Sequence, residues 1–162
     1  MDRALAEVRD PRPLRVRLTI GRAGDVALTT APLPPRPAGW RLMIAPERLD
    51  PDDPRLCHKT TERALYDRTR AALPTGVDEA LFLNTRGELC EGTITTLFAD
   101  LGDGLRTPPL ACGCLPGILR AELLACGRAR EAVLRPDDLA RASLWMGNAL
   151  RGLIPARLHA MP

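Results

Sequence analysis

The chain has 162 residues, and 45% of them are hydrophobic, which is enough for one domain with a buried core. Its net charge of +3 comes from acidic and basic residues that are mixed along the chain, which argues against nucleic acid as a partner and suits a small anionic substrate. No stretch is long or apolar enough to span a membrane, and the five cysteines lack disulfide-like or zinc-like spacing, so we expect a cytoplasmic protein with reduced thiols and no metal site.

The first predicted elements are a short helix and a β-hairpin. The helix should end within residues 1–10, before an Asp-Pro pair. Residues 14–20 alternate apolar and polar side chains, and a glycine-containing turn leads into residues 25–30, which is typical of a hairpin. Residues 31–39 contain four prolines, so we expect a stiff connector there.

Strands and helices are interleaved in the rest of the chain. We expect a loop broken by prolines at 46–56, a helix from Thr60 or Thr61 to about Leu73, a second helix from Pro116-Gly117 to about Cys126, and a helical turn at 136–142. Strands are predicted at 40–45, 79–84, 88–92, 93–100, 105–108, 130–135, 143–148 and 151–158. Because several of these strands are joined as hairpins, the pattern favours a mixed sheet and an α+β fold.

Lys59 lies between the proline-rich loop and the first of these helices. Most lysines are solvated surface residues. A lysine amine can also attack an aldehyde, provided that it loses its solvation and becomes neutral near physiological pH. A place at the mouth of a helix is compatible with either role.

Glu91 stands in GELCEGTITTLF, beside Gly92 and just before an apolar-alternating strand. A carboxylate that enters a strand interior needs a partner, because burying it unpaired is costly. A protonated ring nitrogen would be such a partner, and a ring held in that form is an electron sink. The alternative is an exposed turn glutamate. Gly92 indicates a close approach of the backbone.

The segment LPGILR, residues 115–120, predicts a place for an anion. Pro116 and Gly117 leave free backbone N–H groups at a helix start, where the helix dipole favours negative charge. Ile118 and Leu119 would donate through their amides. The alternative is an ordinary helix start that binds nothing.

Four further polar or small residues are candidates for the same site. Thr95 and Thr96 would add hydroxyl donors to a phosphate or a ring oxygen, or they are simply good strand formers. Asn148 and Ala149 follow Gly147 at a strand end, which suits contact with a phosphate or a substrate carboxylate. Asn148 could equally close a turn.

In this order, Lys59, Glu91, the 115–120 phrase and Asn148 resemble the fold-type IV pyridoxal-phosphate enzymes, the class IV aminotransferase family. The family pattern has a lysine before a helix, then a glutamate in an E-G-x-x-x-N-hydrophobic-F phrase, then L-P-G-I-x-R and a strand end of small residues. The resemblance covers roughly residues 14–158. The family phrase usually has asparagine where Thr96 stands.

The resemblance implies that the cofactor is pyridoxal 5'-phosphate, that Lys59 holds it and shuttles a proton, and that Glu91 keeps the ring nitrogen charged. The remaining cofactor contacts would fall on Thr95, Thr96, Gly117, Ile118, Leu119 and Asn148. Substrate contacts would fall on Arg63, Asn148 and Ala149, with Arg63 pairing either with an anionic group or with a neighbouring acid.

Within the family, Lys59-x-x-x-Arg63 and the ending GNALRGLIPARL look most like 4-amino-4-deoxychorismate lyase, especially the lyase part of synthase–lyase fusion proteins. The implied reaction releases pyruvate from 4-amino-4-deoxychorismate and leaves 4-aminobenzoate, a folate precursor. Two alternatives stay open: a class IV aminotransferase that acts on branched-chain or D-amino acids, and a non-catalytic fragment.

Members of this family have a small N-terminal domain before the point where this chain begins. We therefore expect residues 1–30 to hold the last hairpin of that domain, 31–39 to be an interdomain linker, and 40–162 to form the cofactor-binding large domain, a mixed sheet or pseudo-barrel with flanking helices. The chain would then be a truncated or fusion-derived form. The resemblance also implies a homodimer.

Overall fold

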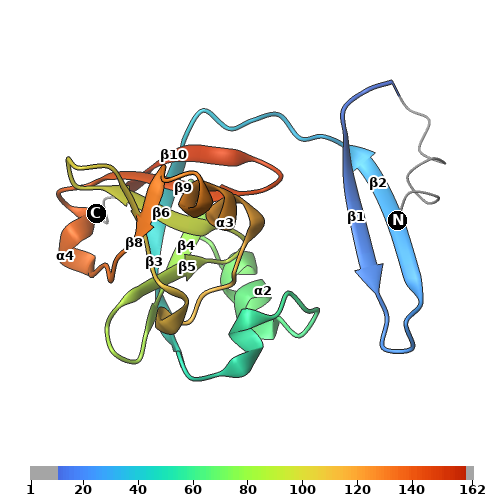
Figure 1. Cartoon of the computed structure of the whole chain (residues 1–162), viewed down its shortest axis with the longest axis horizontal. Coiled ribbons are helices and arrows are strands. Elements are labelled where there is room, and N and C mark those ends of the chain that lie inside the picture. Colours follow the sequence, from blue (N-terminus) through green and yellow to red (C-terminus); the bar gives the residue numbers. More distant parts are fainter. Residues whose placement is uncertain (1–10, 160–162) are drawn as a thin grey trace. The chain divides into compact units, whose positions relative to one another are not determined.

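The computed structural model describes residues 11–159, and the helix expected within residues 1–10 lies outside them. The chain divides into two compact units, one ending at Arg36 and the other beginning at Pro37. The first unit contains the antiparallel hairpin of β1 (Leu14–Ile20) and β2 (Val26–Pro32), as predicted (Figure 1). Residues 33–39 have no helix or strand, in keeping with their prolines.

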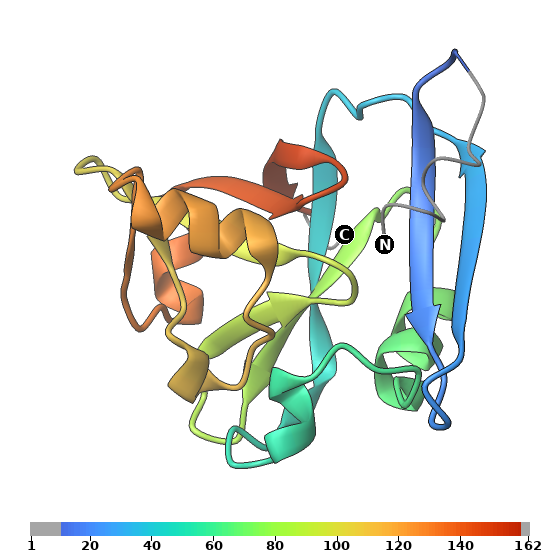
Figure 2. The ribbon, with the colours of Figure 1, turned by 45° about the vertical axis from the view of Figure 1, so that its right-hand side comes forward.

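The second unit is built on one mixed sheet. Its strands are β3 (Trp40–Leu49), β4 (Glu79–Asn84), β5 (Leu89–Gly92), β6 (Thr96–Asp100), β7 (Leu105–Thr107), β8 (Ala129–Glu131), β9 (Ser143–Asn148) and β10 (Gly152–Leu158). They lie in the order β5-β4-β3-β10-β9-β6-β7-β8, and β5 also pairs with β6. That last pairing closes six strands into a ring, which confirms the predicted pseudo-barrel (Figure 2).

The interior of the ring is filled by aliphatic side chains from every ring strand. They include Leu42, Leu81, Leu89, Leu97, Met146 and Ile154, all with no exposed surface. Alternate residues of the same strands point outward and are covered as well: Phe82 lies in the cluster that contains Tyr66, and Phe98 in the cluster that contains Leu123. Strands buried on both faces are apolar throughout rather than alternating.

Helices cover the outside of the sheet. α2 (Ala64–Ala71) packs on β4, α3 (Ile118–Ala125) packs on β8 and β9, and α4 (Pro136–Leu139) is a single turn. Two short 3-10 turns, η1 (Pro54–Cys57) and η2 (Leu110–Cys112), were not predicted. Among residues 11–159, no helix has the length and apolar character that crossing a membrane requires.

Two strands differ from their predicted bounds. β3 continues past residue 45 to Leu49, because its register with β4 shifts between Ile44 and Arg48 and so accommodates Pro46, which has no N–H to donate. The strand predicted at 130–135 is only β8, which is as short as the β7 strand that it pairs with.

The first long helix and the strand after Glu91 are also shorter than predicted. α2 starts at Ala64 rather than near residue 60, because the Thr60 hydroxyl accepts a hydrogen bond from the Glu62 N–H and holds a local turn. β6 begins at Thr96 rather than residue 93, because residues 92–95 form a turn around a buried carboxylate, that of Glu79.

Candidate functional site

Two predicted site residues and a glycine lie side by side across the sheet. Glu91 of β5 pairs with Thr96 of β6, and Thr96 pairs with Gly147 of β9. Side chains of directly opposite residues point to the same face, with Cβ atoms about 5 Å apart. These three residues therefore form a continuous cross-strand row on the outer face of the ring.

A bulge in β5 places Glu91 on that face. Leu81 pairs with Gly92 and Leu83 pairs with Leu89, so that two residues of β5, the second of them Glu91, lie opposite Phe82 alone. A bulge of this kind redirects a side chain that simple alternation would point elsewhere. As a result Glu91 and Phe82 face outward together, toward α2.

The start of α3 lies over the cross-strand row. The Leu115 N–H donates to Glu91 Oε2 at 3.0 Å. A Cβ added to Gly117 would lie 3.5 Å from Thr96 Oγ1, and one added to Gly147 would lie 2.7 Å from Leu119 Cδ2. The segment 115–119 thus runs along the row, and Gly117, the N-cap residue of α3, is close to the Thr96 hydroxyl.

Glu91 is a buried acid with hydrogen-bond donors on both oxygens. Glu91 is only 8% exposed, so the alternative of an exposed turn glutamate is wrong. The Tyr66 hydroxyl donates to Oε1 at 2.8 Å, and Leu115 N–H donates to Oε2. Burial raises the pKa of Glu91, while these two donors and the positive charges of Arg63 and Lys59 act to lower it.

Tyr66 was not predicted as a site residue. It comes from α2, is itself buried, and packs edge-on against Phe82 with ring centroids 5.1 Å apart. Burial, followed by the charge of Glu91, raises the pKa of Tyr66, so its hydroxyl remains a donor. The signal in the sequence is that Tyr66 is the only tyrosine in the chain and follows Lys59 by seven residues.

Lys59 lies between η1 and α2, on the approach to this acid. It is exposed, and it is close enough for its charge to lower the pKa of Glu91. Lys59 is also the only lysine in the chain, and all other strongly basic residues are arginines. An arginine carries a guanidinium group, so Lys59 is the chain's only strongly basic side chain that ends in an amine.

Other predicted residues have their polar groups engaged within the protein. The Thr95 hydroxyl donates to Glu79 Oε2 at 2.8 Å. The Asn148 amide donates to the Ile94 carbonyl and accepts from two N–H groups in the β9–β10 turn, which is the turn-closing role. Ala149 is exposed in that turn.

The Arg63 guanidinium is engaged with groups of the protein itself. Its guanidinium donates to the Thr93 carbonyl and stacks over the Tyr66 ring, 4.7 Å from the centroid. Its charge nevertheless acts on Glu91. Arg63 is therefore part of the wall around the acid.

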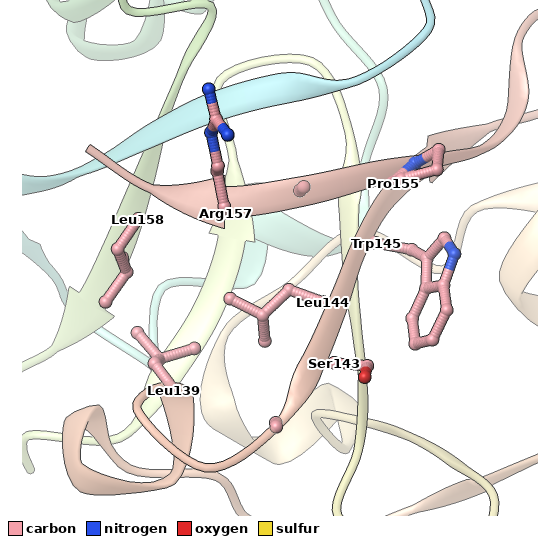
Figure 3. A pocket seen from close by; sticks show the side chains of 9 residues that line it. Leu139, Ser143, Leu144, Trp145, Pro155, Arg157 and Leu158 are labelled. Atoms are coloured by element: carbon pink, nitrogen blue, oxygen red, sulfur yellow. The ribbon is translucent and has the colours of Figure 1, made fainter. Parts of the chain in front are cut away.

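A surface hollow of about 360 Å³ lies elsewhere, between α4, β9 and β10. Figure 3 shows Leu144, Trp145 and Pro155 around it. None of the residues that line it is a predicted site residue. Among residues 11–159, no group of three or more histidine, cysteine or acidic residues is arranged to hold a metal ion.

The comparison with protein families agrees with this geometry. The family described as amino-transferase class IV matches residues 2–158. This chain belongs to that family. The match confirms the family inferred from Lys59, Glu91 and the 115–120 phrase.

Individual class IV relatives include both lyases and aminotransferases. A crystal structure from Mesorhizobium loti, provisionally described as an amino-acid aminotransferase, is 50% identical with a TM-score of 0.90 and covers 98% of this chain and 78% of its own. Aminodeoxychorismate lyase of Saccharomyces cerevisiae is 26% identical and covers 83% of this chain. The 4-amino-4-deoxychorismate lyase structure from Pseudomonas aeruginosa is 25% identical with a TM-score of 0.70, and the match covers 83% of this chain and 56% of that one.

The length of the match differs between these relatives. This chain spans 47% of the yeast lyase, about half of the curated relative that it matches. The branched-chain aminotransferase of Escherichia coli, at 24% identity and a TM-score of 0.70, shares the fold. These relatives therefore share the fold with this chain, and they differ from one another in the reaction that their names describe.

Proposed function

We propose that this chain forms the cofactor-binding part of a pyridoxal-phosphate-dependent lyase, which releases pyruvate from 4-amino-4-deoxychorismate and leaves 4-aminobenzoate. The observation that carries the cofactor assignment is the cross-strand row of Glu91, Thr96 and Gly147 beneath the start of α3. It offers a buried carboxylate at one end and a helix start at the other. The yeast and Pseudomonas aeruginosa relatives support the lyase reaction.

The residues present fit the chemical groups of this cofactor. Glu91 is a buried acceptor suited to a protonated ring nitrogen. The amides of Ile118 and Leu119 lie in the first turn of α3, where the helix dipole favours a phosphate, and Gly117 keeps the approach to the Thr96 hydroxyl open. Thr95 and Asn148 would contribute through the backbone segments that they hold, since their side-chain groups are engaged.

Each of these residues then has a defined task. Pyridoxal phosphate, when bound, supplies an electron sink for negative charge at a carbon next to the substrate nitrogen. Lys59 would hold the cofactor through its amine and would move the proton at that carbon. Glu91 would keep a proton on the ring nitrogen, and Tyr66 and Leu115 would hold the Glu91 carboxylate in place. Arg63 and the exposed Ala149 turn would face an anionic substrate.

A class IV aminotransferase is the second candidate. The 50% identity to the Mesorhizobium loti protein favours it, because that relative also covers nearly all of this chain. Such an enzyme would use the same Lys59 and Glu91 but would finish by passing the amine to a keto acid. The two reactions differ in their products, so a product assay separates them.

Trapping the cofactor on the protein tests the shared part of both candidates. Because Lys59 is the only lysine, borohydride reduction in the presence of pyridoxal phosphate should leave one adduct, on the peptide that contains Lys59. Lys59→Arg is the matched control, since it keeps the positive charge but cannot bind the aldehyde. Wild-type protein without an adduct, or an equal adduct on the variant through its terminal amine, would refute the proposal and favour a non-catalytic fragment.

The product assay then chooses between the candidates. Wild-type protein loaded with pyridoxal phosphate is incubated either with 4-amino-4-deoxychorismate or with an amino acid and a keto acid acceptor. The lyase proposal predicts pyruvate and 4-aminobenzoate in the first mixture, both lost in Lys59→Arg. Amine transfer in the second mixture without pyruvate in the first would replace the lyase by the aminotransferase.

A further inference from the structure

Glu79 is the most deeply buried acid near the site. It opens β4, has no exposed surface, and was not predicted as a site residue. Its Oε1 accepts from the Ala80 N–H at 3.0 Å and from the N–H of Thr93 at 2.9 Å, and also from the Thr93 hydroxyl. Its Oε2 accepts from Ile94 N–H at 3.2 Å and from the Thr95 hydroxyl at 2.8 Å.

Nearly all of these donors belong to the β5–β6 turn, residues 92–95. The turn closes on itself through a hydrogen bond from the Gly92 N–H to the Thr95 carbonyl at 2.7 Å. A Cβ at Gly92 would lie 2.9 Å from Glu79 Oε2 and 2.8 Å from Thr95 Oγ1, so the turn is wrapped tightly around the carboxylate. Its two ends are Glu91 and Thr96, the residues that pair in the cross-strand row.

The same carboxylate reaches the helix that follows Lys59. Arg70, in the last turn of α2, lies 3.6 Å from Glu79 Oε1 and donates to Thr93 Oγ1 at 3.1 Å. Arg63, at the start of α2, donates to the Thr93 carbonyl. Both ends of α2 are thus tied to Thr93, which Glu79 holds through its N–H and its hydroxyl.

We propose that Glu79 is a positioning residue for the cofactor site, an inference that rests on the proposed function. Glu79 fixes the β5–β6 turn and so keeps Glu91 opposite Thr96. Through Thr93 it also positions α2, which carries Tyr66 and follows Lys59, against Glu91. A buried carboxyl group that accepts from several donors gives a rigid arrangement, and replacing one of its acceptor oxygens leaves some of those donors unsatisfied. Glu79 would act through the turn and through Thr93, and not directly on the reacting groups.

Glu79→Gln tests this role, because the glutamine keeps the size of the side chain but replaces one acceptor oxygen by an NH2 group. We expect its dissociation constant for pyridoxal phosphate to rise by about tenfold or more, the scale of a lost orienting contact near a site. We also expect a changed pH dependence of the absorbance of the lysine-bound cofactor, because Glu91 is displaced. Amide hydrogen exchange of residues 92–95, measured without cofactor, should become faster.

Glu88→Gln is the matched control. Glu88 lies at the other end of the β4–β5 hairpin and accepts hydrogen bonds from Asn84 at 2.8 Å and Arg86 at 3.0 Å. Glu88→Gln should lower the melting temperature without changing the affinity for pyridoxal phosphate or the absorbance of the lysine-bound cofactor. Arg70→Met is a second test of the same network from its exposed side and should weaken cofactor binding in the same direction as Glu79→Gln, but less.

The outcomes separate this inference from the proposed function. If wild-type protein forms no adduct at Lys59, the proposed function fails and the inference fails with it. If wild-type protein forms the adduct and a folded Glu79→Gln binds the cofactor with unchanged affinity and absorbance, only the role of Glu79 is refuted. If Glu79→Gln does not fold, Arg70→Met decides, and wild-type affinity in that variant refutes the role.

Discussion

Replacing Tyr66 by phenylalanine removes a single hydroxyl from the candidate site. That hydroxyl donates to Glu91 Oε1 at 2.8 Å in a buried environment. The phenylalanine ring keeps the edge-on contact with Phe82, and it keeps a face for the Arg63 guanidinium, so no cavity forms. The effect of the variant therefore reports on one hydrogen bond to one carboxylate.

The size of the effect should depend on pH. A hydrogen bond to a charged group is worth about 1.5–3 kcal/mol and a neutral one about 0.5–1.5 kcal/mol. Burial raises the pKa of Glu91 in the folded protein. The stability that protonated Glu91 contributes is therefore complete below the unfolded-state pKa, and it is lost as pH rises through the folded-state pKa. The Tyr66 hydroxyl opposes that rise, so Tyr66→Phe should lose more unfolding free energy at alkaline pH than at acidic pH.

Denaturant unfolding of both proteins over a range of pH values measures this difference. The same Tyr66→Phe change in a Glu91→Gln background is the control, because a glutamine does not ionise and the pH dependence should vanish there. A loss of unfolding free energy that is the same at every pH, or that grows toward acidic pH, would show that Tyr66 does not stabilise an ionised Glu91.

Two further predictions concern packing. Gly147→Ala should cost about 1–3 kcal/mol of unfolding free energy, because its Cβ would meet Leu119 Cδ2 at 2.7 Å and the Gly152 carbonyl at 2.9 Å. Gly39→Ala, whose Cβ meets nothing nearer than 3.5 Å, is its control, and equal stability of the two variants would contradict the close approach of α3 to β9. Phe82→Ala should lower the free energy of unfolding by about 3–5 kcal/mol at every pH, because Phe82 is fully buried and uncharged. The same unfolding assay measures this loss, and a strong pH dependence would argue that the main role of Phe82 is to support Glu91.

Much of the local structure could be predicted from short stretches of sequence. Alternation in residues 14–20 identified the hairpin, and the all-apolar core of 79–84 identified β4. Pro116-Gly117 predicted the start of α3, and the predicted end near Cys126 agrees with its C-cap there, which Gly127 follows with φ of 68°. These features depend on the conformational limits of single residues and on contacts within a few positions, so the sequence alone determines them.

Contacts between distant parts of the chain could not be predicted in this way. Alternation does not show the bulge that turns Glu91 toward α2, nor the β5–β6 pairing that closes the ring. Glu79 looks like an ordinary first residue of a strand until the turn at 92–95 is seen wrapped around it. Thr95 was expected either to donate to a phosphate or a ring oxygen or to serve as a strand former, and only the three-dimensional structure shows that its hydroxyl donates to Glu79.

Local structure could be predicted and long-range contacts could not, and this difference has a physical cause. The sequence by itself determined most of the strands and the longer helices, and that a lysine, an acid and a helix start occur in the order typical of one family. Which donors surround Glu91, and which threonine faces the start of α3, was decided only by the tertiary structure. Those contacts depend on register between strands that are far apart in the chain, and a shift of one residue would turn each side chain to the other face.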